Sequence, residues 1–347
     1  MPPILRSFVS PEELDLTDLV TYDELASRAK TFNRSEALHF LGFVNLLLSV
    51  ATIETARTGK IEPVRDVQTR LASNLLSAGL LSDLRAQLGT SSLLDRPLLH
   101  RSQVLFAIRL VATHGRADTQ GNCLQIRDDF DGLGDLLFRV NGLFRPLTPP
   151  RGALPLWVAA DSAPLNELES PPRLELTWPR VHRLLTEYLP AAVPDSTRLA
   201  EIESVALFGS GFNTEQWLDL NFLLSSYWTA VPFGTLMENR DRAYLRTDKD
   251  HEAISQGMLG RSLQTLGVPF DAVPDALKLA SFEQSALYDL TPFRKTPLWL
   301  MPNNLALCID ASMVVERLGA FAYWSVMNSL DTPERRKTFS SCGFRKF

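Results

Sequence analysis

Apolar and polar positions along the first 145 residues alternate with helical spacing, and the segments start and stop at recognisable signals. The longest predicted helix runs from Glu36 to about Arg57. A side-chain oxygen of Asn33 or Ser35 can cap its first turn, and Gly59 marks its end. Apolar residues lie nearly all round this helix, which indicates a position in the centre of a bundle.

Further helices are predicted along the rest of this N-terminal region. They cover approximately residues 64–78, 81–88, a segment whose first turn holds Pro97, and 128–144. Each carries apolar side chains on one face. The region from 1 to 145 is therefore expected to be a helical bundle.

Composition changes abruptly after this bundle. Ten of the 22 prolines fall between Pro146 and Pro194. Proline removes a backbone donor and fixes φ, so we expect no regular helix to run through this stretch. Trp157 and Trp178 favour a packed loop region over a bare linker, because indole rings gain most from burial. The expected division is thus 1–145, a Pro-rich segment 146–195, and 196–347.

The second half returns to helical spacing. Helices are expected near 180–189, 198–208, 214–228, 249–266 and 275–288. Two short apolar runs within 298–309 flank a Pro-Asn-Asn turn and predict a small β-hairpin. Asp310 or Ser312 would cap a last helix from Met313 to Leu330. The predicted fold class is mainly α, an irregular multi-helix bundle with one small hairpin.

Composition and charge narrow the classes of protein. The net charge is −5, with 35 basic and 40 acidic residues, which argues against a dedicated nucleic-acid surface. Three widely spaced cysteines, Cys123, Cys308 and Cys342, exclude a disulfide framework and fit a reducing compartment. Only seven basic residues are lysine, a bias typical of GC-rich bacterial genomes. We expect a bacterial, cytoplasmic protein.

Two N-terminal features bear on membranes. The first residues, Met-Pro-Pro-Ile-Leu-Arg-Ser, lack the charged start and apolar core of a signal peptide. The apolar segment from Ala37 to Ile53 spans 17 residues and contains His39, Asn45 and Ser49. A membrane span needs roughly 20 residues, and polar side chains inside lipid are costly. A buried helix is therefore expected, and no membrane partner.

The strongest chemical motif is a Phe-Gly-Ser turn at Gly209 and Ser210, followed by Asp219-x-Asn221. It resembles the nucleotidyltransferase family, in which the turn holds a triphosphate and paired carboxylates hold magnesium. Here Asn221 replaces the second carboxylate, and an amide brings no charge to a metal. A strand from 218 to 224 would place Asp219 and Asn221 on one face, but the length of the apolar pattern favours a helix.

We therefore expect no catalytic site, metal or cofactor, and keep a nucleotide with magnesium at Gly209, Ser210 and Asp219 as the alternative. Other motifs are absent from the sequence. The histidines (39, 100, 114, 182 and 251) show no metal-binding spacing, and no P-loop, dinucleotide fingerprint or hydrolase elbow is present. The acids at 128, 129 and 131 are typical of a helix N-terminus. His39 and Cys308 are expected in the core.

Two groups of residues point to binding. The tryptophans all follow residue 150, and large aromatic side chains often anchor interfaces, which makes four of them candidates: Trp217, Trp228, Trp299 and Trp324. The C-terminal segment is basic and aromatic. Nucleic-acid association through it is a further alternative, using Arg335, Arg336, Lys337, Arg345 and Lys346. Residues 333–337 are expected to leave a helix, and the phenylalanines after them to need contacts from outside the chain.

Four short segments carry a resemblance to a known class. They are 135–143 (DLLFRVNGL), 291–298 (TPFRKTPL), 308–310 (CID) and 320–324 (AFAYW). Together they resemble the helical N-terminal region of large uncharacterised bacterial proteins, some of which continue into a nuclease-like C-terminal domain. The resemblance implies a sensor or scaffold role in a larger effector or defence system. The expected partner is another protein or a missing C-terminal domain.

The sequence thus predicts a non-catalytic helical scaffold, sensor or regulatory module that acts through protein interaction.

Overall fold

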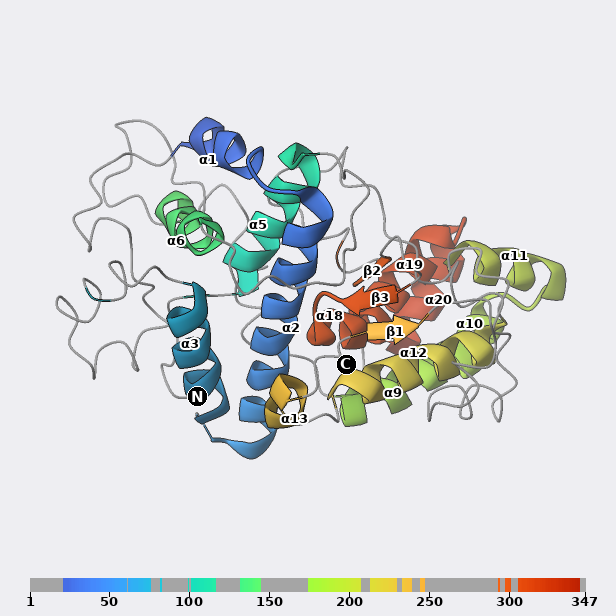
Figure 1. Ribbon diagram of the computed structural model, residues 1–347. Coiled ribbons are helices and arrows are strands. Elements are labelled where there is room, and N and C mark those ends of the chain that lie inside the picture. The colour runs from blue at the N-terminus through green and yellow to red at the C-terminus, as the bar shows by residue number, and fades with distance from the viewer. Residues whose placement is uncertain are drawn as a thin grey trace, which may run out of the picture. The chain divides into compact units, whose positions relative to one another are not determined.

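The fold is mainly α, as the sequence predicts (Figure 1). The computed structural model describes residues 21–60, 62–75, 82, 99, 101–116, 132–144, 174–206, 213–229, 233–238, 244–246, 293, 297–300 and 305–343. The chain divides into two compact units. Unit 1 comprises Met1–Pro171 with Ser281–Leu290, and unit 2 comprises Pro172–Ala280 with Thr291–Phe347.

Unit 1 is built around two long buried helices. Its described elements are α1 (Tyr22–Ala29), α2 (Arg34–Thr58), α3 (Glu62–Leu75), α5 (Arg101–His114) and α6 (Leu133–Phe144). The most extensive packing in the unit is between α2 and α5, and α3 also packs on α2 (Figure 1). The short helix α1 lies against α5 and α6. All residues of α5 from Arg101 to Val111 are buried, so this helix lies at the centre of the unit.

The ends of α2 are set by the residues that the sequence indicates. The Asn33 side chain accepts a hydrogen bond from the Glu36 N–H at 3.2 Å, which caps the first turn. Gly59 has φ 70°, a left-handed conformation that suits glycine, and its N–H donates to the Thr55 carbonyl. Both predicted signals are confirmed.

By length and composition alone, α2 would also pass as a membrane span, with a mean hydropathy of 1.6 over its most apolar 18 residues. However, 78% of that stretch is buried inside the molecule. His39, Asn45 and Ser49 are among the buried residues, and each has a partner within the chain. The predicted buried central helix is confirmed.

Unit 2 contains the remaining described elements. Its helices are α9 (Leu174–Arg183), α10 (Leu189–Ala192), α11 (Ser196–Ala206), α12 (Thr214–Thr229), α13 (Phe233–Glu238), α18 (Ala311–Glu316), α19 (Ala322–Ser329) and α20 (Pro333–Gly343), with π-helical turns η2 (Leu184–Tyr188) and η5 (Arg317–Phe321). The helix α12 packs against α18, and α11 packs against α19. The helix α20 packs on α10 and η2.

A small antiparallel sheet completes unit 2, in the order β1–β3–β2. Strands β2 (Leu298–Leu300) and β3 (Leu305–Cys308) form the hairpin that the sequence predicts, with Trp299 opposite Leu307. Strand β1 (Tyr244–Arg246) adds to the other edge of β3, and nothing in its sequence predicted this. The Asp310 side chain then caps α18, accepting from the N–H groups of Ser312 and Met313.

The helix predicted near 180–189 is present, but it begins earlier, so the expectation that no regular helix runs through the prolines is wrong at the C-terminal end of the Pro-rich segment. Helical backbone is continuous from Leu174 to Ala192, with Pro179 inside α9 and Pro190 in the first turn of α10. Proline is tolerated where a hydrogen bond is already absent. The π turn η2 ends at Tyr188, two residues before Pro190. The Leu189 N–H donates a hydrogen bond to the carbonyl of Leu184, five residues earlier in the chain. This wider turn provides the irregularity that proline needs.

The C-terminal segment also differs from expectation. Residues 333–337 begin a helix, α20, instead of leaving one. Pro333 occupies the first helical position, and the Thr332 hydroxyl accepts from the Arg335 N–H at 3.2 Å. The predicted helix from 313 to 330 is present as α18, η5 and α19, with a non-helical kink at Gly319.

Several predictions fall outside the described residues. They include the helices at 249–266 and 275–288, the Pro97 turn, all but Ser82 of the segment 81–88, and the acids at 128, 129 and 131.

Candidate functional site

The nucleotidyltransferase-like residues lie on a helix, not a strand. Asp219 and Asn221 both belong to α12. Residues separated by two positions on an α-helix are rotated by about 200° around its axis, so these two side chains lie on different faces. The Asn221 amide instead donates to the Trp217 carbonyl of its own helix, at 2.8 Å. Gly209 and Ser210 lie outside the described residues. The shared face that a magnesium clamp needs is therefore not formed by this pair.

The surroundings of Asp219 are aromatic as well as charged. Burial raises the pKa of its carboxyl, the neighbouring Glu215 raises it further, and His182 of α9 opposes this. The centroid of the Trp178 ring lies 4.7 Å from that of Phe222 and 5.7 Å from that of His182. Across the described residues, no group of three His, Cys, Asp or Glu side chains is placed to hold a metal ion.

Cys308 and His39, which the sequence places in the core, are both buried. Cys308 is completely buried, and burial raises the pKa of its thiol well above the ordinary value, with Asp310 adding to the effect. A thiol held in its neutral form is a poor nucleophile. His39 is 3% exposed and has a partner within the chain. Both match the core roles that the sequence predicts.

The tryptophans separate into two classes. Trp217 and Trp228 are 0% and 1% exposed, which places these two binding candidates in the core of unit 2. Trp299 lies in β2, and only its backbone pairing is described. By contrast, the Trp324 side chain is 54% exposed. Of the three candidates whose side chains the structure describes, Trp324 is the one at the surface.

Trp324 is held by a ladder of rings that begins in the core. Phe339 of α20 is completely buried and stacks on Tyr323, with ring centroids 5.5 Å apart and planes at 17°. Tyr323 in turn meets Trp324 edge-on, at 5.2 Å and 80°. This arrangement fixes an exposed indole to the hydrophobic core. It also shows that Phe339, expected to need contacts from outside the chain, finds them within it.

The surface around Trp324 follows one side of α19. Met327 and Asn328 lie three and four positions after Trp324, so the three residues share a helix face; Met327 is half-buried and Asn328 is exposed. We call these three residues the α19 face. Burial raises the pKa of the neighbouring Tyr323, so its hydroxyl remains protonated at neutral pH. The α19 face is therefore uncharged.

Two of the three described basic candidates, Arg335 and Arg336, bond within the chain. Arg335 bonds to Asp331 at 2.8 Å, and Asp331 also lies 3.4 Å from Arg198 of α11. The Arg336 side chain donates to the Leu330 carbonyl at 2.8 Å, at the end of α19. Lys337 is exposed, and the other two basic candidates, Arg345 and Lys346, lie outside the described residues. The arginines described here act as ties inside unit 2.

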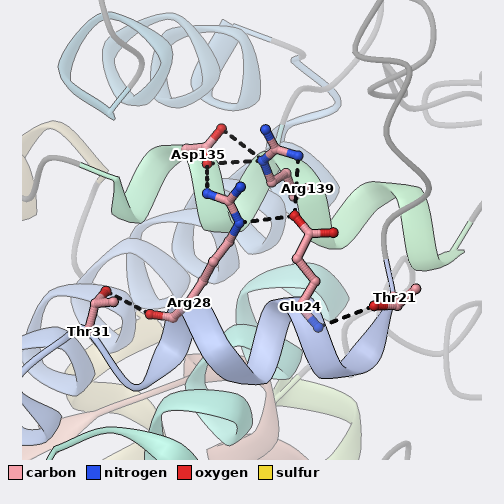
Figure 2. Close-up of polar contacts among 6 residues, drawn as sticks. All are labelled: Thr21, Glu24, Arg28, Thr31, Asp135 and Arg139. Carbon is pink, nitrogen blue, oxygen red and sulfur yellow. Dashed lines mark hydrogen bonds and ion pairs between the residues drawn. The ribbon is translucent and has the colours of Figure 1, made fainter.

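Unit 1 holds a charge network that the sequence did not indicate (Figure 2). Arg28 of α1 bonds to Glu24 at 3.2 Å and to Asp135 of α6 at 2.8 Å. Arg139 of α6 bonds to Asp135 at 3.1 Å and lies 3.5 Å from Glu24. Two acids and two bases alternate around a ring, so their charges cancel. Arg28 and Asp135 are 107 residues apart, and no local pattern could pair them.

A second polar contact joins α1 to α5. The Tyr22 hydroxyl lies 2.8 Å from Nε2 of His114, and the two rings meet at 67°. Burial lowers the pKa of His114, with a smaller contribution from Lys30. The neutral imidazole can therefore accept the Tyr22 hydrogen bond at physiological pH. Both contacts position α1.

No family model, curated protein or solved structure matches this chain. The residues and their geometry therefore carry the proposal that follows.

Proposed function

We propose that this protein is a non-catalytic helical scaffold, sensor or regulatory module that binds another protein through the α19 face. One observation carries the proposal, the exposure of Trp324 on a ring ladder anchored in the core. An indole that is already held in place loses little conformational entropy when a partner covers it. Tryptophan is also among the residues that most often dominate binding energy.

Leu176 gives a useful contrast within the same unit. It is 51% exposed on α9, and it and Trp324 are the large hydrophobic side chains exposed among the described residues. Single exposed apolar residues are ordinary on protein surfaces. An exposed tryptophan supported by two further rings is less ordinary, so we assign the binding role to Trp324.

The setting of Asp219 favours binding over nucleotide chemistry. Its helix places it and Asn221 on different faces, so the pair does not form the shared face that a magnesium clamp needs. The ties of Arg335 and Arg336 within the chain likewise count against a phosphate-binding surface there. As a class of partner we propose an effector domain or chain in the bacterial cytoplasm, following the resemblance described above.

Site-specific photo-crosslinking in cells tests the proposal. A photoreactive residue at Asn328 lies one helical turn from Trp324 and is exposed. We expect a crosslinked protein of defined mass that disappears when Trp324→Ala is added and persists when Leu176→Ala is added. Crosslinking that survives Trp324→Ala would overturn the assignment of the α19 face.

A further inference from the structure

The buried side of α12 carries an unusual row of polar groups. Trp217, Asn221, Ser225 and Trp228 follow one another at spacings of four, four and three residues, which places them on one helix face. Their exposed fractions are between 0% and 1%. This face packs on α18, since the Ser225 hydroxyl reaches the Val314 carbonyl at 3.4 Å.

Three atoms in this row lack a hydrogen-bond partner. They are Nε1 of Trp217, Oδ1 of Asn221 and Nε1 of Trp228. A buried polar atom without a partner costs roughly 1–3 kcal/mol, and such atoms are rare in folded proteins. A buried water molecule can satisfy such atoms, typically with roughly two to four hydrogen bonds to polar groups that lack a protein partner.

The Trp217 and Asn221 atoms are complementary. An indole N–H can only donate, and an amide oxygen can only accept. Asn221 lies one turn after Trp217, and its amide is pinned to the Trp217 carbonyl by the 2.8 Å bond from Nδ2. That bond leaves Oδ1 as the free end of an oriented amide beside the same turn. A water molecule can accept from the first atom and donate to the second.

Trp228 provides an internal contrast. Its indole is as buried as that of Trp217, but the polar side chain on the preceding turn, Ser225, already donates to Val314. The acceptor without a partner, Asn221 Oδ1, lies seven residues away. Ser225 Oγ keeps lone pairs that can accept, but unlike Asn221 Oδ1 it already has a hydrogen-bond partner, so Trp228 has no orphaned acceptor on the preceding turn.

We propose that one water molecule is bound in the core of unit 2 on this face of α12, accepting from Trp217 Nε1–H and donating to Asn221 Oδ1. This is a structural site, and it is independent of the function proposed for the α19 face.

Water-to-indole nuclear Overhauser spectroscopy tests this on the full chain, deuterated and labelled with ¹⁵N. The indole resonances are assigned with Trp217→Phe and Trp228→Phe. We expect a cross-peak from a long-lived water to the Trp217 Nε1 proton and none to that of Trp228. Asn221→Leu should remove the cross-peak while circular dichroism stays unchanged. A folded wild-type chain with no water cross-peak at Trp217 would overturn the proposal. If Asn221→Leu does not fold, the comparison of Trp217 with Trp228 in the wild-type chain is the deciding result.

Discussion

Helices α12 and α19 belong to the same unit, and they use tryptophan in opposite ways. On α12, Trp217 and Trp228 are among the largest completely buried side chains of the described residues. On α19, the neighbouring residue Tyr323 enters the core, and Trp324, about 100° further round the helix, is 54% exposed. Residue type alone therefore does not identify a binding residue. The position of the helix relative to the core does so, and this follows from tertiary packing.

The largest expected effect is the difference in unfolding free energy between a variant of a core tryptophan and a variant of the surface tryptophan. Trp217→Ala should lower the free energy of unfolding by about 3–5 kcal/mol, because it removes a buried ring and leaves a cavity. Trp324→Ala should lower it by less than about 1 kcal/mol, since the ring is half-exposed. Urea denaturation followed by circular dichroism measures both. Equal losses for the two variants would show that the division into core and surface tryptophans is mistaken.

A second prediction concerns Gly319, in the turn η5 that precedes α19. A Cβ at Gly319 would lie 3.1 Å from the Thr177 side chain of α9. Gly319→Val adds two further methyl groups and should cost about 1–3 kcal/mol through overpacking. Gly234→Val is the matched control, since nothing lies within 4 Å of a Cβ there. If both variants unfold at the same urea concentration, α9 does not pack against the kink as described.

The charge network of unit 1 allows the stability contribution of ion pairs to be compared with that of buried aromatic rings. Arg139 has a 13% exposed side chain and contacts both acids of the charge network. Arg139→Gln should cost about 1 kcal/mol or less, because partly exposed ion pairs are screened by solvent. The loss should shrink further at high salt. A salt-independent loss as large as that of Trp217→Ala would show that the network, and not apolar packing, dominates the stability of α1 and α6.

The smallest expected effect concerns the partly exposed side of α12. The pKa of Asp219 is raised, so the folded state favours the protonated carboxyl. That favourable contribution is complete below the ordinary value of 3.8 and is lost as pH rises through the folded pKa. Asp219→Asn keeps a neutral side chain, so it should unfold at a slightly higher urea concentration than wild type at pH 7 and at about the same one at pH 3. Lower stability of the variant at pH 7 would contradict the direction of the shift.

Local signals predicted those parts of the fold that depend on local physics. Asn33 and Gly59 bound α2, Asp310 caps α18, and the length of the apolar pattern after Thr214 indicates a helix. The start of α20 was also readable, because Thr332 and Pro333 are a typical cap and first residue. The prediction that 333–337 leave a helix is therefore wrong even though both start signals stand in the sequence.

The candidate site depends on contacts that no local pattern specifies. Trp217 follows four polar residues (213–216) and Trp324 follows four apolar ones (320–323), yet Trp217 is buried and Trp324 is exposed. Stacking of Tyr323 on Phe339 directs that neighbouring ring, and not Trp324, toward the core. Likewise, the ties from Arg28 to Asp135 join residues 107 positions apart. Such pairings arise from packing of whole helices, and an isolated sequence carries no direct record of them.

The most direct test of the role of Trp324 is the affinity for the protein captured at Asn328. Isothermal titration calorimetry would compare wild type, Trp324→Ala and the core control Trp228→Phe. We expect Trp324→Ala to weaken binding roughly 30-fold or more, the effect of losing about 2 kcal/mol at a central interface residue. Trp228→Phe changes a ring in the core and keeps an aromatic side chain there, so this variant should bind the captured protein with wild-type affinity. Wild-type affinity in Trp324→Ala would contradict the central claim that the α19 face is the binding surface.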